Sequence, residues 1–289
     1  MQSGHAELII PPGYQPRLSL METEIAIKEI KDFFERSLAR ELNLTRVSAP
    51  LFVVPESGLN DNLSGVERPV DFMIRAPKET KCEIVQSLAK WKRMALQKYG
   101  FVLGEGLYTD MNAIRQDENL DNLHSAYIDQ WDWEKVISRE ERTTETLKKI
   151  TGSIYKALKA TEDHICGLYP VLERLLPEQI SFVTTQELED QYPDLTPKQR
   201  ENAITREKGV VFLIGIGGRL KSGMRHDGRA PDYDDWNLNG DIIFWYPMLE
   251  TAFEISSMGI RVDQETLLTQ LRFARCEDRG RFKFHQDLL

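Results

Sequence analysis

Residues 210–216 read Val-Val-Phe-Leu-Ile-Gly-Ile, and this continuous apolar run decides the fold class. A strand with apolar side chains on both faces has to be covered on both faces, so the run predicts a buried central strand. The helix expected just before it starts at Thr196-Pro197 and ends at Gly209, because a capping threonine, a first-turn proline and a terminal glycine are common helix boundaries. Together they indicate an α+β domain built on a central sheet.

Further elements of both kinds are expected on either side of this strand. Helical spacing of apolar residues predicts helices at 21–40, 86–98 and 140–166. Short or alternating apolar stretches predict extended segments at 45–47, 51–54, 70–75, 82–85, 106–115, 124–133, 180–184, 241–246 and 252–256. Ser138 and Glu141 form the expected capping pair of the helix at 140–166. No repeat or linker interrupts the pattern, so residues 1–289 are expected to form a single domain.

The composition is that of an ordinary soluble globular protein, with 41% hydrophobic and 29% charged residues. The 37 basic and 46 acidic residues give a net charge of −9, which argues against general binding to nucleic acid or to anionic membranes but allows one nucleotide in a pocket. The three cysteines are far apart, so neither a disulfide framework nor a zinc site is expected. Without a signal peptide or an apolar run of about 18 residues, the protein is expected to be cytoplasmic.

A second informative stretch, residues 225–236, reads Arg-His-Asp-Gly-Arg-Ala-Pro-Asp-Tyr-Asp-Asp-Trp. Its four carboxylates crowd against two guanidiniums, and like charges at this spacing repel one another unless something offsets them. A metal ion, an amino group or a nucleotide phosphate would each explain the arrangement. A solvated acidic turn is the alternative.

Four further polar clusters lie at predicted strand ends or in adjoining loops. They are Asp61 to Gly65; Ser87, Lys90, Lys92 and Arg93; Arg115 with the strand 126–134; and Asp241, Glu254, Ser257 and Arg261. Alternation places Gln130, Asp132 and Glu134 on one face of that strand, and burying three polar groups without partners would be costly. Asp241 and Glu254 can hold Mg²⁺ through oxygen ligands. The respective alternatives are an Asx-turn, an amphipathic helix, a half-exposed strand and a salt bridge.

The sequence signatures of other nucleotide-binding folds are absent. There is no GxxxxGK[ST] phosphate loop, no GxGxxG motif that opens a helix, and no GxSxG nucleophile elbow. The residues by themselves therefore indicate an α+β enzyme with a pocket rich in Asp and Arg, suited to Mg²⁺, a phosphate and a zwitterion.

Seven segments, in order along the chain, resemble the ammonia-dependent asparagine synthetases, the aspartate–ammonia ligases without a glutaminase domain. They are DNLSGVERPV (61–70), EIVQSLAKWKR (83–93), GEGLYTDMNAIR (104–115), LHSAYIDQWDWE (123–134), RHDGRAPDYDDW (225–236), LNGDI (238–242) and FEISSMGIRVD (253–263). The likeness runs from about residue 14 to residue 289. It implies the fold of class II aminoacyl-tRNA synthetase catalytic domains, with a mainly antiparallel sheet flanked by helices, and a homodimer whose interface includes the helix before Pro50.

The same resemblance implies a two-step reaction on L-aspartate, ammonia and ATP. ATP adenylates the β-carboxylate and releases pyrophosphate; ammonia then attacks β-aspartyl-AMP to give L-asparagine and AMP. The implied catalytic residues are Arg115, Lys92 and Asp234. The implied substrate-binding residues are Asp61, Ser87, Gln130, Asp132, Ser257 and Arg261. The implied nucleotide-binding residues are Arg115, Arg229, Asp241 and Glu254, of which Asp241 and Glu254 would hold Mg²⁺.

Within these roles, Arg115 would neutralise the α-phosphate as charge develops on it. Asp61, Gln130 and Asp132 would bind the substrate ammonium, while Lys92 and Arg261 would face carboxylate. No nucleic-acid or membrane partner is implied.

The chain departs from the family pattern at three places. Gln86 stands where the family usually has a histidine, next to Ser87, and Asn237 stands where the family carries a longer loop. The glycine-rich third class II motif is not found in residues 1–289. Because these gaps fall where a mobile loop and a terminal segment would lie, we expect that the sequence omits segments of a longer protein. Two other functions stay open: an impaired paralogue that senses asparagine or AMP, and a synthetase-like enzyme acting on tRNA.

Overall fold

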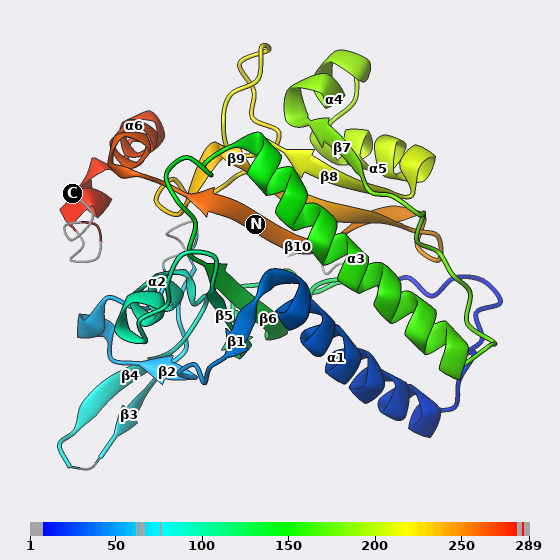
Figure 1. The fold of residues 1–289 in the computed structure, drawn as a ribbon, viewed down its shortest axis with the longest axis horizontal. Helices are drawn as coiled ribbons and strands as arrows, with labels where there is room; N and C mark the ends of the chain where they lie inside the picture. The colour runs from blue at the N-terminus through cyan, green and yellow to red at the C-terminus, as the bar shows by residue number, and fades with distance from the viewer. Residues whose placement is uncertain (1–7, 62, 64–66, 76, 282–284, 286–289) are drawn as a thin grey trace.

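The computed structural model describes residues 8–61, 63, 67–75, 77–281 and 285. Its two longest helices, α1 (Leu20–Leu42) and α3 (Thr144–Leu168), lie side by side over one face of the strands (Figure 1). α1 begins with a capping box, in which the Ser19 hydroxyl accepts a hydrogen bond from the Glu22 backbone and the Glu22 carboxylate accepts one from the Ser19 backbone. Such a cap contributes about 1 kcal/mol to the start of a helix.

The first sheet has the strand order β1-β5-β6 and supplies one wall of the cavity described below. β1 (Leu44–Arg46) pairs with β5 (Gly106–Ile114) in parallel, and β5 forms an antiparallel pair with β6 (Tyr127–Lys135). Trp131 of β6 packs on Phe34 of α1, whereas Asp132 bonds to Lys92 of α2 (Ala89–Lys98). Trp131 and Asp132 therefore lie on opposite faces of β6, as the alternation of its side chains predicted.

The second sheet has the order β10-β9-β8-β7 and contains the core of the protein. Its strands are β7 (Ser181–Thr184), β8 (Val210–Ile214), β9 (Asp234–Tyr246) and β10 (Thr251–Arg261), of which β7 and β8 are parallel and the other pairs antiparallel. Phe212 packs towards α3, and Leu213 packs towards α4 (Thr185–Gln191) and α5 (Pro197–Lys208). The prediction that this run is a buried central strand is confirmed, since all five residues of β8 are buried.

The remaining elements lie at the periphery. β2 (Phe52–Val53), β4 (Thr80–Ile84) and β3 (Asp71–Ile74) form a small antiparallel sheet whose β3–β4 hairpin projects from the body of the protein (Figure 1). Short 3₁₀ turns η1 (Pro55–Ser57) and η2 (Glu277–Arg281) and the helix α6 (Gln264–Ala274) complete the described elements. Within the described ranges, no helix is both long and apolar enough to cross a membrane.

Several expected boundaries are wrong. The strands do not form one central sheet: within the part of the chain that the structure describes, β6 and β10 are edge strands of separate sheets. α3 begins at Thr144 rather than near residue 140, because Ser138 and Glu141 cap a separate turn and the Thr143 side chain caps the helix. α2 begins at Ala89, and Gln86 and Ser87 precede it, because the Gln86 backbone N–H is bonded to the Asn60 side chain.

Two helices were not predicted. α4 has a capping box between Thr184 and Glu187, and α6 has Asp263 as its N-cap, bonded to the Thr266 backbone. Both signals are readable in the sequence, but each helix is short and adjoins a stretch that was interpreted as extended. Asn62, Ser64 and Gly65 of the first polar cluster lie outside the described residues.

Truncating the core strand tests the packing. Leu213→Ala should lower the free energy of unfolding by about 2–5 kcal/mol, because the leucine has no exposed surface and its removal leaves a cavity. Leu103→Ala, at a leucine that is 60% exposed, should change it by about 0.5 kcal/mol or less. Urea denaturation of both variants measures the difference, and equal stabilities would contradict this account of the core.

Candidate active site

A cavity of about 1450 Å³ lies between the two sheets. Its walls include β6, β10, the start of α2, the residues that follow β5 and the acidic stretch 228–234. Ten of the residues assigned from the sequence line it: Ser87, Lys92, Arg115, Gln130, Asp132, Arg229, Asp234, Glu254, Ser257 and Arg261. Asp61 and Asp241 are buried next to the walls rather than among the lining residues. Residues that are up to 174 positions apart in the sequence are thus brought to one cavity.

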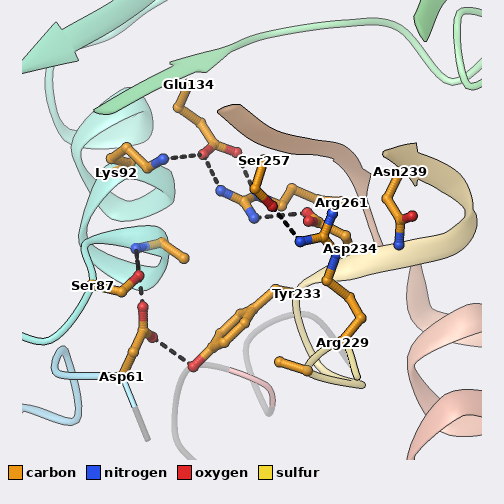
Figure 2. A network of polar contacts seen from close by, with 12 residues as sticks. Asp61, Ser87, Lys92, Glu134, Arg229, Tyr233, Asp234, Asn239, Ser257 and Arg261 are labelled. Carbon is orange, nitrogen blue, oxygen red and sulfur yellow. Dashed lines mark hydrogen bonds and ion pairs between the residues drawn. The ribbon is translucent and has the colours of Figure 1, made fainter. Parts of the chain in front are cut away.

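One side of the cavity is a ladder of alternating charges (Figure 2). Lys92 bonds to Asp132 and lies 3.4 Å from Glu134. Arg261 donates to both oxygens of Glu134, at 2.8 and 2.5 Å, and to Asp234 at 2.8 Å. With three carboxylates and two cations, the ladder carries one excess negative charge. Such a surface can accept both ends of a zwitterion by exchanging internal ion pairs for contacts with the ligand.

Glu134 is the centre of this ladder. Burial opposes its ionisation, but the charges of Arg261 and Lys92 outweigh burial and lower the pKa of Glu134 from 4.5 to about 2. Burial opposes the charge of Arg261 too, but the carboxylates of Glu134 and Asp234 outweigh burial and raise the pKa of Arg261 above its ordinary value. Glu134 was recognised in the strand pattern but was not assigned to the site, because nothing in the sequence shows that its partner would be Arg261, 127 residues away.

Two further guanidinium groups, those of Arg115 and Arg229, line the cavity. Arg115 follows β5 and lines the cavity, and among the described residues its side chain has no hydrogen-bonding or ion-pairing partner. Arg229 donates to the Ser257 hydroxyl (Figure 2). It also donates to Asp241 at 2.8 Å. An uncompensated guanidinium in a cavity wall is a site for an anion.

Two carboxylates on neighbouring strands adjoin Arg229. Asp241 of β9 pairs in register with Ser257 of β10, and Glu254 lies beyond a β-bulge on β10. Burial raises the pKa of both carboxyls; burial and the charge of Asp241 together raise that of Glu254 to about 7. Two buried carboxylates that repel one another leave electrostatic room for a cation. No cluster of three or more possible metal ligands occurs in the described part of the chain.

Asp61 is buried behind the residues that line the cavity and forms hydrogen bonds to them. Its oxygens accept a hydrogen bond from the Tyr233 hydroxyl at 2.5 Å and one from the Ala89 backbone at 3.2 Å, and Lys90 lies 3.9 Å away. Tyr233, which itself lines the cavity, was not among the predicted site residues. Its sequence neighbours Asp232 and Asp234 drew attention, but a tyrosine between two acids carries no signal of its own.

Two of the alternatives that assigned no function to the polar clusters are wrong. The basic residues of α2 are not a solvated face, because Lys90 and Lys92 are both buried. The stretch 225–236 is not a solvated acidic turn either, since Asp232, Asp234 and Asp235 are buried. Each of these acids has a basic partner: Arg279, Arg261 and Arg142, respectively.

Replacing Glu134 should change how stability depends on pH. Because its pKa in the folded protein lies below 4.5, its contribution is complete above pH 4.5 and is lost as the pH falls towards 2. Between pH 7 and pH 3.5 the wild type should lose about 1.4 kcal/mol that Glu134→Gln does not lose. Urea denaturation at both values measures this, with the exposed Glu178→Gln as a control. Parallel losses in wild type and Glu134→Gln would contradict the assignment.

Solved structures with a similar fold are aminoacyl-tRNA synthetases of class II. The asparaginyl-tRNA synthetase of Pyrococcus horikoshii, complexed with asparaginyl-adenylate, superimposes with a TM-score of 0.61 at 14% identity, covering 92% of this chain and 61% of that chain. The Entamoeba histolytica enzyme, also with asparaginyl-adenylate, gives 0.59 at 13% identity over 92% and 59%. The class II fold expected from the sequence is thereby confirmed.

Sequence comparisons reach further than the fold. The family model for aspartate–ammonia ligase matches residues 21–289. An aspartate–ammonia ligase of Clostridium perfringens is 65% identical over 98% of this chain and 84% of its own length. Enzymes of the same name from Ruminiclostridium cellulolyticum and Levilactobacillus brevis are 63% and 58% identical, with the same coverage. With the fold and a cavity lined by charged residues already described, this match means that the chain belongs to the aspartate–ammonia ligase family.

Proposed function

We propose that the protein joins ammonia to the β-carboxylate of L-aspartate through β-aspartyl-AMP, with release of pyrophosphate, AMP and L-asparagine. The observation that carries this proposal is Arg115, a guanidinium without a side-chain partner among the described residues, in the wall of the cavity that also contains the charged ladder. Such a cavity suits a phosphate and an amino acid side by side. No covalent bond to the enzyme is needed.

The first step forms a bond between a β-carboxylate oxygen of aspartate and the α-phosphorus of ATP, while the bond to pyrophosphate breaks. Negative charge grows on the α-phosphate oxygens, and Arg115 would stabilise it. In the second step the nitrogen of ammonia attacks the acyl carbon and AMP leaves with the bonding electrons of the C–O bond. The attacking nitrogen loses one proton to solvent, which leaves the NH₂ group of the amide.

The charged ladder would position aspartate. Asp132, with Gln130 beside it, offers acceptors for the substrate ammonium, and Lys92 and Arg261 offer donors for carboxylate. Asp234, which is bonded to Arg261, would orient that guanidinium. Binding exchanges existing ion pairs for new ones, which fixes orientation at little cost in desolvation because these groups are already buried.

Asp61, Ser87 and Ser257 complete the proposed substrate set. The Asp61 carboxylate already accepts hydrogen bonds from Tyr233 and the Ala89 backbone, so it would hold the wall that Ser87 and Ala89 form and add negative charge behind it. Ser257 would change partners between Arg229 and the ligand.

Asp241 and Glu254 fit a Mg²⁺ ion that accompanies ATP. Both offer the oxygen donors that Mg²⁺ prefers, and two protein carboxylates are what such sites commonly supply, with phosphate oxygens and water as the other ligands. The ion would neutralise phosphate charge. Arg229, bonded to Asp241, would share the phosphate-facing position.

We also propose a cytoplasmic homodimer. α1 exposes Leu20, Met21, Ile25 and Ile27, which are 90%, 70%, 55% and 48% accessible, and a second copy would cover this apolar face. The three cysteines are unpaired, as expected in a reducing compartment. The net charge of −9 gives no reason to expect a nucleic-acid partner.

The decisive experiment follows the β-carboxylate oxygen atoms of aspartate into the products. Incubated with ATP, Mg²⁺, ammonium and L-aspartate labelled with ¹⁸O in its β-carboxylate, the protein should yield asparagine and AMP that carries one ¹⁸O. Formation of ADP, or of AMP without label, contradicts the adenylate. Binding of asparagine or AMP without turnover would favour the sensor, and a requirement for tRNA would favour the synthetase-like enzyme.

Arg115→Ala should lower kcat/KM for adenylation by about 10²–10³-fold, because the charge that stabilises the α-phosphate is lost. Arg115→Lys should recover part of the loss. The measurement is aspartate-dependent exchange of pyrophosphate into ATP, with Arg174→Ala, at a half-exposed surface ion pair, as the matched control. Unchanged exchange in Arg115→Ala would remove this residue from the chemistry.

A further inference from the structure

The segment between β8 and β9 carries Arg229 to the cavity, and its first part is held by the sheet itself. The Asn239 side chain accepts a hydrogen bond from the Ile216 backbone N–H and donates one to the Ile216 carbonyl, both at 2.9 Å. A Cβ on Gly217 would lie 2.6 Å from the Trp236 ring and 2.9 Å from Cβ of Arg229, so this glycine allows the segment to pass close to Arg229. What holds the segment just before Arg229 is a different contact.

That contact is a buried pair between His226 and Glu201. His226 Nε2 lies 3.0 Å from Glu201 Oε1, and the histidine side chain is only 1% exposed. Glu201 is also bonded to Lys198 at 3.1 Å. Since His226 stands three residues before Arg229, fixing its ring limits where the Arg229 backbone can lie.

Glu201 belongs to α5, which is itself bonded to the strand that carries Glu254 and Ser257. The Asn202 side chain accepts a hydrogen bond from the Ala252 backbone at 2.7 Å, and Lys198 donates to the Ala252 carbonyl at 3.3 Å. α5 therefore connects His226 with the start of β10. The segment with Arg229 and the strand that Arg229 contacts share one support.

A gain in stability is not a good explanation for the buried His226–Glu201 pair. A buried ion pair pays for its desolvation and is often matched by apolar side chains of similar size. In addition, His226 Nδ1 is buried and has no hydrogen-bond partner among the described residues, which is unfavourable whatever the protonation state of the ring. Directional hydrogen bonding, unlike apolar packing, fixes the position of the chain.

We propose that His226 and Glu201 are positioning residues that align Arg229 with the phosphates of the nucleotide. The inference rests on the proposed function, in which Arg229 faces ATP, and adds to it two residues that touch no substrate. The Arg229 guanidinium bonds to Ser257 (Figure 2) and to Asp241, and the His226–Glu201 pair sets the direction from which the side chain approaches them.

Kinetics of His226→Leu and His226→Gln test the proposal. His226→Leu should raise KM for ATP about tenfold while KM for aspartate changes less than about twofold, because only the nucleotide end is misaligned. His226→Gln should retain most of the ATP affinity, since its amide can donate to Glu201. If both substrates are affected equally, or if glutamine is as harmful as leucine, the proposal is wrong.

A control is available in the same chain. His164 also pairs with Glu29, at 2.8 Å, between α3 and α1 and away from the cavity, although this pair is more exposed than that of His226. His164→Leu should leave KM for ATP unchanged even if it lowers the melting temperature. An equal rise of KM for ATP in His164→Leu would show that the effect is general and would overturn the assignment.

A double-mutant cycle shows whether His226 acts through Arg229. In an Arg229→Met background, His226→Leu should add no further loss of ATP affinity, whereas additive losses would mean an independent role. If His226→Leu does not fold, Glu201→Leu against Glu201→Gln replaces it in the cycle. ATP affinity is measured by calorimetry with Mg²⁺ and does not depend on turnover. If the wild-type protein binds ATP but makes no asparagine, the proposed reaction is wrong, but the double-mutant cycle still decides the role of His226.

Discussion

The ion pair between Glu134 and Arg261 is the contact on which the site depends. It joins β6 of one sheet to β10 of the other through two hydrogen bonds from the Arg261 guanidinium to the Glu134 carboxylate, at 2.8 and 2.5 Å. Among the described residues, these two edge strands are not hydrogen-bonded to each other through their backbones. Both side chains are largely buried, so breaking the pair would leave an uncompensated charge in a poorly solvated place. The width of the cavity is therefore set by side chains whose chemistry also suits the ligand.

The fold was predictable where the pattern of burial is local. The apolar run of β8 identified a strand covered on both faces, and alternation along β6 separated Trp131, which packs on Phe34, from Asp132, which faces Lys92. The division into separate sheets was not predictable, because the order of strands depends on contacts between distant segments. Gln86 and Ser87 likewise lie outside α2 because of a hydrogen bond to Asn60, which no helical periodicity reveals.

The candidate site was predictable as a set of residues but not as a set of partners. Seven matched segments indicated which side chains converge, and ten of the assigned residues line one cavity. Nothing in the sequence indicated that Tyr233 bonds to Asp61 across 172 residues, or that Glu134 stands between Lys92 and Arg261. Their individual roles in binding and catalysis stay predictions.

The alternating ladder has a consequence for turnover. In the proposed reaction L-aspartate arrives with one net negative charge and L-asparagine departs with none, so the reaction would remove the charge that distinguishes substrate from product. A wall whose lysine and arginine are already paired with carboxylates would hold either amino acid with moderate strength. Tight binding of the amino acid would slow the release of product. A wall whose own ion pairs form again when the product leaves would favour that release.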